Sequence, residues 1–237
     1  MLFSYTLFLI VFSALFWGLF IVFCILLPIL STIFTPLFFS SRTSYRFFYR
    51  LFLRLWVFLS LRSPQVCGIK NIPKKGGLVI ISNHPSAFDT LLLNAISPRY
   101  LNAFAFSTFI LFKFPIVRFV SQKIGFFEVD AFHPMLAAKV MPKITELVKN
   151  GEALIFIGIG KILDLPHKPL RFPLGLYSVL KDTDPVILPV YIKDGYPIEF
   201  PIKKLRPAVV IGAPLKKEDI LAGRESYITD VLRSMAF

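Results

Sequence analysis

The start of this 237-residue chain lacks charge, and acidic residues are absent for longer still. Residues 1–41 contain no Asp, Glu, Lys, Arg or His, and no Asp or Glu occurs before Asp89. A helix that crosses a bilayer needs about 20 predominantly apolar residues, and residues 2–27 meet that requirement. The sequence therefore predicts an N-terminal membrane-embedded helical segment, with a single span preferred and a hairpin within one leaflet as the alternative.

Cysteine and histidine are also scarce. The chain has two cysteines, Cys24 and Cys67, and three histidines, His84, His133 and His167. Neither set has the spacing of a metal site, and two cysteines of which one lies in the apolar segment do not make a disulfide framework. The sequence predicts neither a metal nor another cofactor.

Positive charge and apolar side chains are what the chain has in excess. Lys and Arg number 27 against 14 Asp and Glu, which gives a formal net charge of +13, and 55% of the residues are hydrophobic. Such a charge suits nucleic acid or an anionic membrane surface. The hydrophobic content and the lack of a recognisable nucleic-acid motif favour the membrane as partner over nucleic acid.

Residues 42–62 predict a helix with a basic stripe. The stripe consists of Arg42, Arg46, Arg50 and Arg54, with aromatic residues and leucines between them. We expect this helix to lie in the membrane interface, with its guanidinium groups at the lipid phosphates and its rings among the acyl chains. The alternative is a second membrane helix that buries the stripe against protein, which is costly without an acidic partner. Positive charge directly after the apolar segment places the remaining domain on the cytoplasmic side.

From residue 63 onward, short apolar runs alternate with amphipathic segments. Strands are expected at residues 65–72, 77–81, 101–106, 126–129, 153–157, 186–192 and 208–211. Helices are expected at residues 87–96, 112–121, 134–149, 173–180 and 216–235, the last with a break near Gly223. This alternation predicts an α/β domain over residues 63–237, with a mainly parallel central sheet flanked by helices. Residues 1–62 form the preceding membrane segment and basic helix.

The candidate catalytic residues, His84 and Asp89, follow a short apolar run. Because residues five apart lie on different faces of one helix, they meet only if His84 lies in the turn before a helix and Asp89 in its first turn. Ser86 is a plausible N-cap for that helix. A histidine held in this way suits a general base whose tautomer the carboxylate fixes. The structural alternative stays open, because Ser86-x-x-Asp89 is also a capping-box pattern.

The order Asn83-His84-x-Ser86-x-x-Asp89 after an apolar strand resembles the first motif of the glycerolipid (1-acyl-glycerol-3-phosphate type) acyltransferase superfamily, whose pattern is His-x4-Asp. The resemblance implies transfer of an acyl group from acyl-CoA or acyl-carrier protein to a lipid hydroxyl. It also implies that His84 takes the hydroxyl proton and Asp89 orients His84, with no acyl-enzyme. The runs Val186–Tyr191 and Val210–Leu215 resemble later motifs of the same superfamily.

The phosphate-handling motifs of this superfamily are altered. Gly125–Asp130 resembles the second motif, but Ala131 stands in place of its arginine. In the third motif Gly158 replaces the glutamate and Gly160 the threonine, while Lys161 is the basic residue that remains. Two glycines two apart suit either an anion-binding turn or an ordinary solvated loop. The residues expected to contact substrate are Asn83, Ser86, Gly125, Gly158, Gly160 and Lys161.

Compared with the motifs of this superfamily, the chain has the base and its orienting carboxylate but lacks the phosphate-binding groups. The sequence therefore predicts an active membrane O-acyltransferase whose acceptor is not ordinary lysophosphatidic acid. The alternative is a catalytically inactive relative of the same fold that binds lipid or acts as a scaffold.

Overall fold

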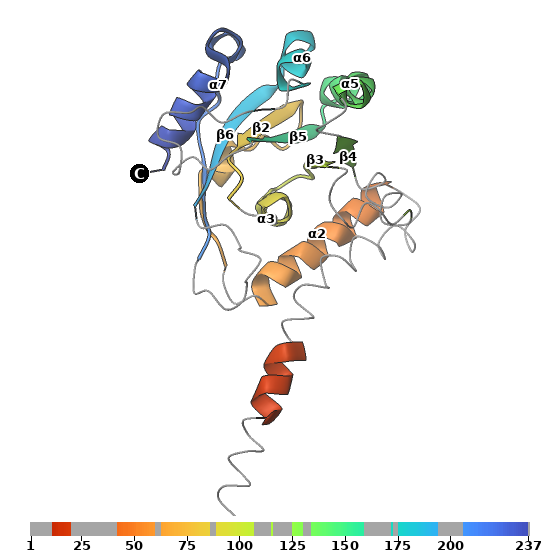
Figure 1. Ribbon diagram of the computed structural model, residues 1–237, viewed down its shortest axis with the longest axis vertical. Coiled ribbons are helices and arrows are strands. Elements are labelled where there is room, and N and C mark those ends of the chain that lie inside the picture. The colour runs from red at the N-terminus through yellow and green to blue at the C-terminus, as the bar shows by residue number, and fades with distance from the viewer. Residues whose placement is uncertain are drawn as a thin grey trace, which may run out of the picture.

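The centre of the computed structural model is a seven-stranded sheet with helices on both faces (Figure 1). The structure describes residues 11–19, 42–59, 63–85, 89–106, 115, 125–129, 134–158, 172, 175–193 and 206–236. The strands are β1 (Gln65–Cys67), β2 (Leu78–Ser82), β3 (Asn102–Phe106), β4 (Phe126–Val129), β5 (Ala153–Ile157), β6 (Val186–Lys193) and β7 (Ala208–Ile211). The helices are α2 (Arg42–Leu59), α3 (Asp89–Ile96), α5 (Pro134–Lys149), α6 (Gly175–Asp182) and α7 (Lys217–Ser234), with a 3-10 helix at Ile69–Asn71.

The strand order is β1-β7-β6-β2-β5-β3-β4. The five strands from β6 to β4 pair in parallel. Strand β7 pairs antiparallel with β6, and β1 runs parallel to β7. Every residue of β2 is buried, as expected for a central parallel strand that is covered on both faces. The predicted mainly parallel α/β sheet is confirmed.

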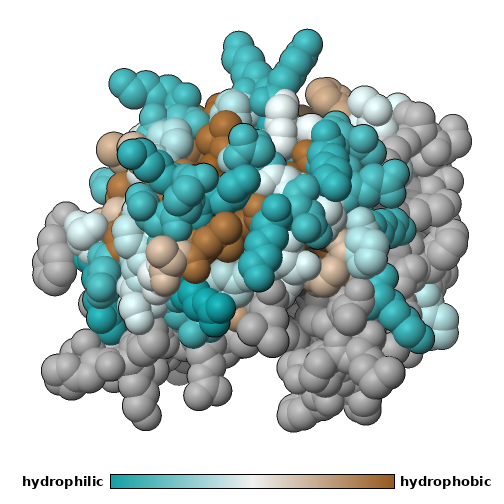
Figure 2. Space-filling view, turned by 90° about the horizontal axis from the view of Figure 1, so that it is seen from above, coloured by the Kyte–Doolittle hydropathy of each residue, from teal (hydrophilic) through white to brown (hydrophobic). Residues whose placement is uncertain are grey.

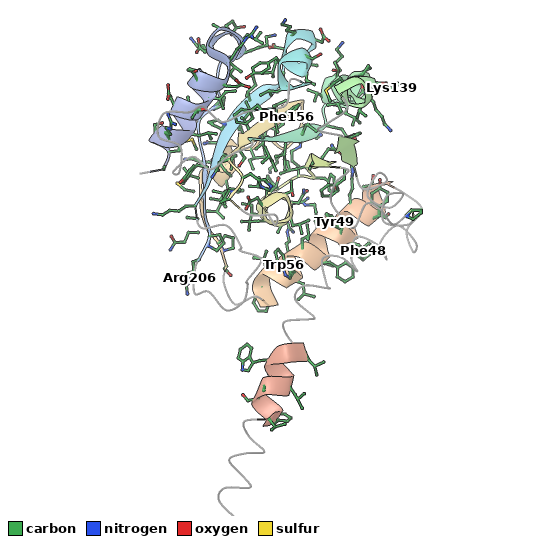
Figure 3. All side chains as sticks on the ribbon, viewed as in Figure 1. Phe48, Tyr49, Trp56, Lys139, Phe156 and Arg206 are labelled. Carbon is green, nitrogen blue, oxygen red and sulfur yellow. The ribbon has the colours of Figure 1, made fainter. Side chains whose placement is uncertain are left out.

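Side chains of the central strands enter two separate cores, because successive residues of a strand point to opposite faces. Leu78 and Ile80 of β2 belong to the core beneath α2 and α3, which includes Tyr49 and Trp56 of α2 (Figure 3). Val79 and Ile81, with Phe156 of β5, belong to the core under α5, α6 and α7. Helix α2 thus packs into the same core as the sheet.

Two element boundaries reflect backbone conformations. The strand expected at residues 65–72 ends at Cys67, because Gly68 adopts a left-handed φ of 78° and a 3-10 helix follows. A Cβ at Gly68 would lie 2.0 Å from the carbonyl oxygen of Ile211, so the close approach requires glycine. Helix α7 is interrupted at Arg224, with φ 48° and ψ −132°, next to the predicted break at Gly223. The helix expected at residues 112–121 lies outside the described residues except for position 115.

The predicted lipid-facing orientation of the basic stripe on α2 is wrong for Arg46 and Arg50, whereas Arg54 is exposed even though its Nε bonds to protein. Arg46 Nη2 lies 2.8 Å from Glu152 Oε2, and Arg50 and Arg54 donate hydrogen bonds to backbone carbonyls of α3 and the residues after it. The acidic partner that the neighbouring sequence lacks comes from residue 152, which the fold brings to α2. Four large apolar side chains of α2 are exposed: Phe47, Leu51, Leu55 and Phe58.

The N-terminal segment is described only in part. Residues 11–19 are helical and exposed. Among the described residues, no helix combines the length and apolar character that a membrane span requires. The predicted membrane-embedded segment therefore lies mostly outside the described residues and stays a prediction.

Candidate functional site

The predicted catalytic pair lies at the carboxyl end of β2, beside β5. The chain leaving β2 enters α3 on one face of the sheet, whereas the chain leaving β5 continues to α6 on the other face. In open α/β sheets, ligands bind outside the carboxyl ends of neighbouring strands whose connections leave toward opposite faces. His84 thus lies at the edge of the sheet where ligands bind in this class of fold.

Hydrogen bonds on both sides fix the chain immediately before His84. Asn83 Nδ2 donates to the carbonyl oxygen of Ile192 at 2.8 Å, and the Ile192 N–H donates to Asn83 Oδ1 at 2.7 Å. On the other side of β2, the Gly158 N–H donates to the carbonyl oxygen of Ser82 at 2.7 Å. The Asn83 side chain thus continues the pairing with β6, and the turn that carries His84 is tied to both strands next to β2.

His84 and Asp89 form a hydrogen-bonded pair in which His84 Nδ1 lies 3.0 Å from Asp89 Oδ2. Asp89 is the first residue of α3, where the positive end of the helix dipole stabilises a carboxylate. Its side chain is 1% exposed, whereas that of His84 is 38% exposed. A neutral imidazole that donates its Nδ1 proton to Asp89 keeps the lone pair on Nε2, which can then accept a proton from a bound hydroxyl.

The other expected site residues divide into three groups. Gly158 is buried directly after β5, at the same edge of the sheet as His84. Asn83 is also at this edge, but it is only 6% exposed and its amide is bonded to β6. Ser86, Gly160 and Lys161 lie outside the described residues.

The structure does not bring Gly125 together with His84. Gly125 directly precedes β4, at the amino-terminal edge of the parallel strands. Its φ of 100° and the position of its missing Cβ, which would lie 2.1 Å from Asn102 Oδ1, explain the glycine by close packing. A role for Gly125 in substrate contact is therefore not supported. The carboxyl end of β4 at Val129 is the part of this motif that points toward the edge that carries His84.

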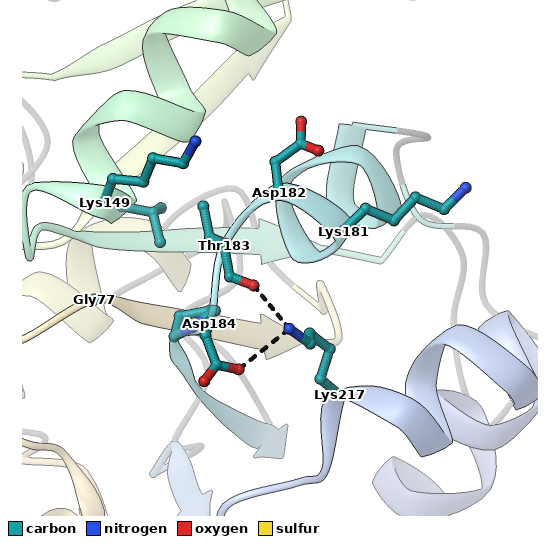
Figure 4. Close-up of a pocket in the computed structure, with 9 residues that line it drawn as sticks. Gly77, Lys149, Lys181, Asp182, Thr183, Asp184 and Lys217 are labelled. Carbon is teal, nitrogen blue, oxygen red and sulfur yellow. Dashed lines mark hydrogen bonds and ion pairs between the residues drawn. The ribbon is translucent and has the colours of Figure 1, made fainter.

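A polar groove of about 500 Å³ opens at the amino-terminal edge of the sheet, away from the catalytic pair (Figure 4). Lys217 Nζ lies 3.2 Å from Asp184 Oδ1 and 3.2 Å from the carbonyl oxygen of Thr183. The ammonium groups of Lys149 and Lys181 point away from Lys217 (Figure 4). Charged side chains dominate this lining, so the groove does not fit an acyl chain.

No group of three His, Cys, Asp or Glu side chains suited to a metal ion occurs in the part of the chain that the structure describes.

The structure thus has a histidine–carboxylate pair at the carboxyl edge of a mainly parallel α/β sheet. The family model described as Acyltransferase matches residues 63–193, which is more than half of the chain. The chain belongs to the acyltransferase family, as the His-x4-Asp motif indicated.

A solved structure with the same fold is the crystal structure of the 1-acyl-sn-glycerophosphate (LPA) acyltransferase PlsC from Thermotoga maritima. The TM-score is 0.63 at 19% sequence identity, and the alignment covers 92% of this chain and 94% of the other. At this identity the similarity is one of fold. A comparison with curated proteins gives no match.

Proposed function

We propose that this acyltransferase is membrane-associated and transfers a fatty acyl group from an acyl thioester to the hydroxyl group of a glycerolipid. The observation that carries the proposal is the 3.0 Å contact between His84 Nδ1 and Asp89 Oδ2 at the carboxyl edge of the sheet. Family membership supplies the reaction class, and the PlsC-like fold supports a glycerolipid acceptor. The thioester is carried by coenzyme A or by acyl-carrier protein.

The proposed reaction is direct transfer with His84 as the general base. His84 Nε2 accepts the proton of the lipid hydroxyl while the hydroxyl oxygen attacks the thioester carbonyl carbon. The new C–O bond forms, the C–S bond breaks, and the imidazolium returns the proton to the departing thiolate. Asp89 stabilises the imidazolium in between, so one ester and one thiol leave and the histidine is regenerated. General-base catalysis of this kind contributes about 10²–10⁴-fold to the rate.

The altered third motif supports an acceptor other than ordinary lysophosphatidic acid. Gly158 supplies no carboxylate where the superfamily has glutamate, and its N–H is bonded to the carbonyl oxygen of Ser82. This N–H is therefore engaged within the sheet and is not directed at an anion. Ala131, in the place of the second-motif arginine, removes a further phosphate-binding group.

Exposed apolar side chains support association with the membrane. Phe47 and Phe58 on the outer side of α2 are 62% and 69% exposed. The face that carries α5, α6 and α7 is mostly hydrophilic (Figure 2). A helix with apolar residues outward on one side of a domain suits the boundary between headgroups and acyl chains. We place the catalytic domain, residues 63–237, on the cytoplasmic side, because arginines directly follow the apolar segment.

Turnover assays test this proposal. Purified full-length protein is incubated with acyl-CoA or acyl-carrier protein and a panel of lysolipids and lipid alcohols. We expect at least one acceptor to be acylated, and we expect His84→Ala to lower that rate by about 10²–10⁴-fold. Asp184→Asn, an exposed position at the opposite edge of the sheet, is the matched control and should keep activity. Equal rates for the wild type and His84→Ala on every acceptor would reject the proposal in favour of an inactive lipid-binding relative.

A further inference from the structure

The helix that carries Asp89 is short and depends on outside contacts for its carboxyl end. Helix α3 has eight residues, and isolated helices of this length are marginal in water. The last four carbonyl groups of any helix lack partners within the helix. In this chain α2 lies across α3 (Figure 1), so the groups on α2 that face α3 can satisfy those carbonyls.

Arg50 of α2 contacts three carbonyl oxygens at this end. Its Nε donates to Asn94 at 3.3 Å, its Nη2 donates to Ser97, and its Nη1 approaches Pro98 at 3.4 Å. The planar guanidinium group suits this arrangement, because its five N–H donors point in fixed directions.

Arg54, one turn further along α2, contributes a fourth contact. Its Nε donates to the carbonyl oxygen of Ala95 at 3.2 Å. Helix α3 therefore has a carboxylate at its positive end and two guanidinium groups at its negative end, both of which favour the helix dipole. Burial, and to a lesser extent the nearby Arg54, lower the pKa of Arg50. Burial and the repulsion from Arg54 thus disfavour the charged form of Arg50. Its hydrogen bonds to the carbonyl groups at the end of α3 offset this unfavourable free energy.

The position of α3 determines the position of Asp89. The helix runs from the carboxyl edge of the sheet, where Asp89 meets His84, to the amino-terminal edge, where the arginines hold it. A helix of this length is about 12 Å long at 1.5 Å per residue. A hydrogen-bonded helix of this length is stiff, so we expect that loosening one end changes the position of the other.

We propose that Arg50 and Arg54 are positioning residues for acyl transfer, because they hold the carboxyl end of α3 and thereby fix Asp89 against His84. This inference rests on the proposed function for its kinetic consequence. The same helix presents Phe47 and Phe58 outward, so the element that we propose to rest on the lipid also sets the geometry of the catalytic pair.

The full-length double variant Arg50→Met/Arg54→Met removes the donors and keeps most of the aliphatic volume. We expect kcat to fall by about 10–100-fold, since a misplacement of about 1 Å at a catalytic group costs on the order of 100-fold. The KM values for donor and acceptor should change little, because neither arginine is placed in the substrate site. Arg50→Lys/Arg54→Lys keeps the charges and should recover part of the loss.

Asn71→Ala is the control variant. Asn71 Nδ2 donates to the carbonyl oxygens of Ile211 at 3.0 Å and Gly212 at 2.9 Å. These partners lie at the end of β7, away from α3 and the residues that follow it. This variant should therefore lose stability but keep kcat at temperatures where it is folded. An equal loss of kcat in Asn71→Ala would indicate a general stability effect and would overturn the inference.

A second readout does not depend on turnover. A histidine Nδ1 proton bonded to a carboxylate gives a downfield proton NMR resonance, which can be assigned through its loss in His84→Ala. We expect this resonance to broaden or move in the double variant and to stay unchanged in Asn71→Ala. If the double variant does not fold, Arg54→Met alone, which loses one hydrogen bond, gives the same comparison.

The two readouts separate the inference from the proposed function. An unchanged resonance together with an unchanged kcat in the arginine variants would overturn the inference and leave the acyl-transfer proposal standing. A changed resonance in a protein without turnover would support the link between α2 and the pair while rejecting the proposed reaction.

Discussion

Replacing Asn83 by alanine should weaken the fold and catalysis together, because this side chain joins the turn before His84 to β6. The variant leaves the N–H and the carbonyl oxygen of Ile192 without their partner, and Ile192 is buried. An unsatisfied buried polar group costs about 1–3 kcal/mol. Two such groups give a loss of about 2–6 kcal/mol, and the lower half of this range is expected because water can enter at the edge of the sheet. We expect kcat to fall at least about tenfold, since His84 loses its fixed position.

Asn71→Ala is the matched control for this experiment. Asn71 Nδ2 donates to the carbonyl oxygens of Ile211 at 3.0 Å and Gly212 at 2.9 Å. These bonds hold the 3-10 helix to β7, which lies two strands away from β2. Denaturant titrations should therefore give a comparable loss of the free energy of unfolding, while kcat of the folded protein stays unchanged.

The kinetic constants distinguish positioning from substrate contact at Asn83. A fall in kcat with little change in KM supports the bonds to β6 as the function of this side chain. A raised KM for the acceptor with kcat unchanged would instead support the substrate contact that the motif predicts for Asn83. An unchanged kcat and KM in a destabilised Asn83→Ala variant would refute the reasoning that the turn needs its tie to β6.

Four further predictions follow from the geometry. Asp89→Asn should lower kcat by about 10⁴-fold in steady-state assays, because an amide favours the wrong histidine tautomer. Gly125→Ala should lower the free energy of unfolding in denaturant titrations by about 1–3 kcal/mol, because of its left-handed φ and close packing, with activity per folded molecule retained. Phe47→Gln/Phe58→Gln should weaken sedimentation with lipid vesicles by about 3 kcal/mol or more. Burial raises the pKa of Tyr177 to about 12, so the stability that its neutral form contributes is complete below about pH 10 and is lost as the pH rises toward 12. Denaturant titrations should therefore show that Tyr177→Phe loses less stability than the wild type across that pH window.

Elements with strong local signals are predicted correctly from the sequence. The predicted bounds of α5 agree with the structure, because a glycine with a left-handed φ of 82°, Gly151, follows its last residues. The apolar runs of β5 and β7 also begin and end where the sequence indicated. These boundaries depend on residues that are adjacent in the chain, so a local pattern is sufficient to find them.

The orientation of α2 depends on a residue far away in the sequence. A period of four identifies the arginine stripe, but it does not say whether lipid or protein faces it. The contacts that turn the arginines toward protein come from Glu152, 106 residues after Arg46, and from the carbonyl groups at the end of α3. Backbone carbonyl groups that accept hydrogen bonds from arginine cannot be recognised from residue types. The absence of nearby Asp and Glu therefore suggested lipid phosphates, and not protein, as the partner of these arginines.

At the site, too, the local motif predicts only part of the arrangement. The spacing of His84 and Asp89 excludes a shared helix face, so it restricts their contact to a turn followed by the first turn of a helix, which is the arrangement observed. It was not sufficient to separate a residue that contacts substrate from one that supports the site. Asn83 is bonded to a strand that comes more than a hundred residues later, and Gly125 lies at the wrong edge of the sheet for the site.

The two members of the catalytic pair are held by different parts of the molecule. His84 is fixed from the sheet, through Asn83 and the strands on both sides of β2, whereas Asp89 is fixed by α3 and, through it, by α2. On the proposal above, the 3.0 Å contact between His84 Nδ1 and Asp89 Oδ2 depends on the alignment of α2 with the sheet as well as on the local backbone. Because a hydrogen bond weakens beyond about 3.2 Å, we expect the loss of either support to weaken the pair.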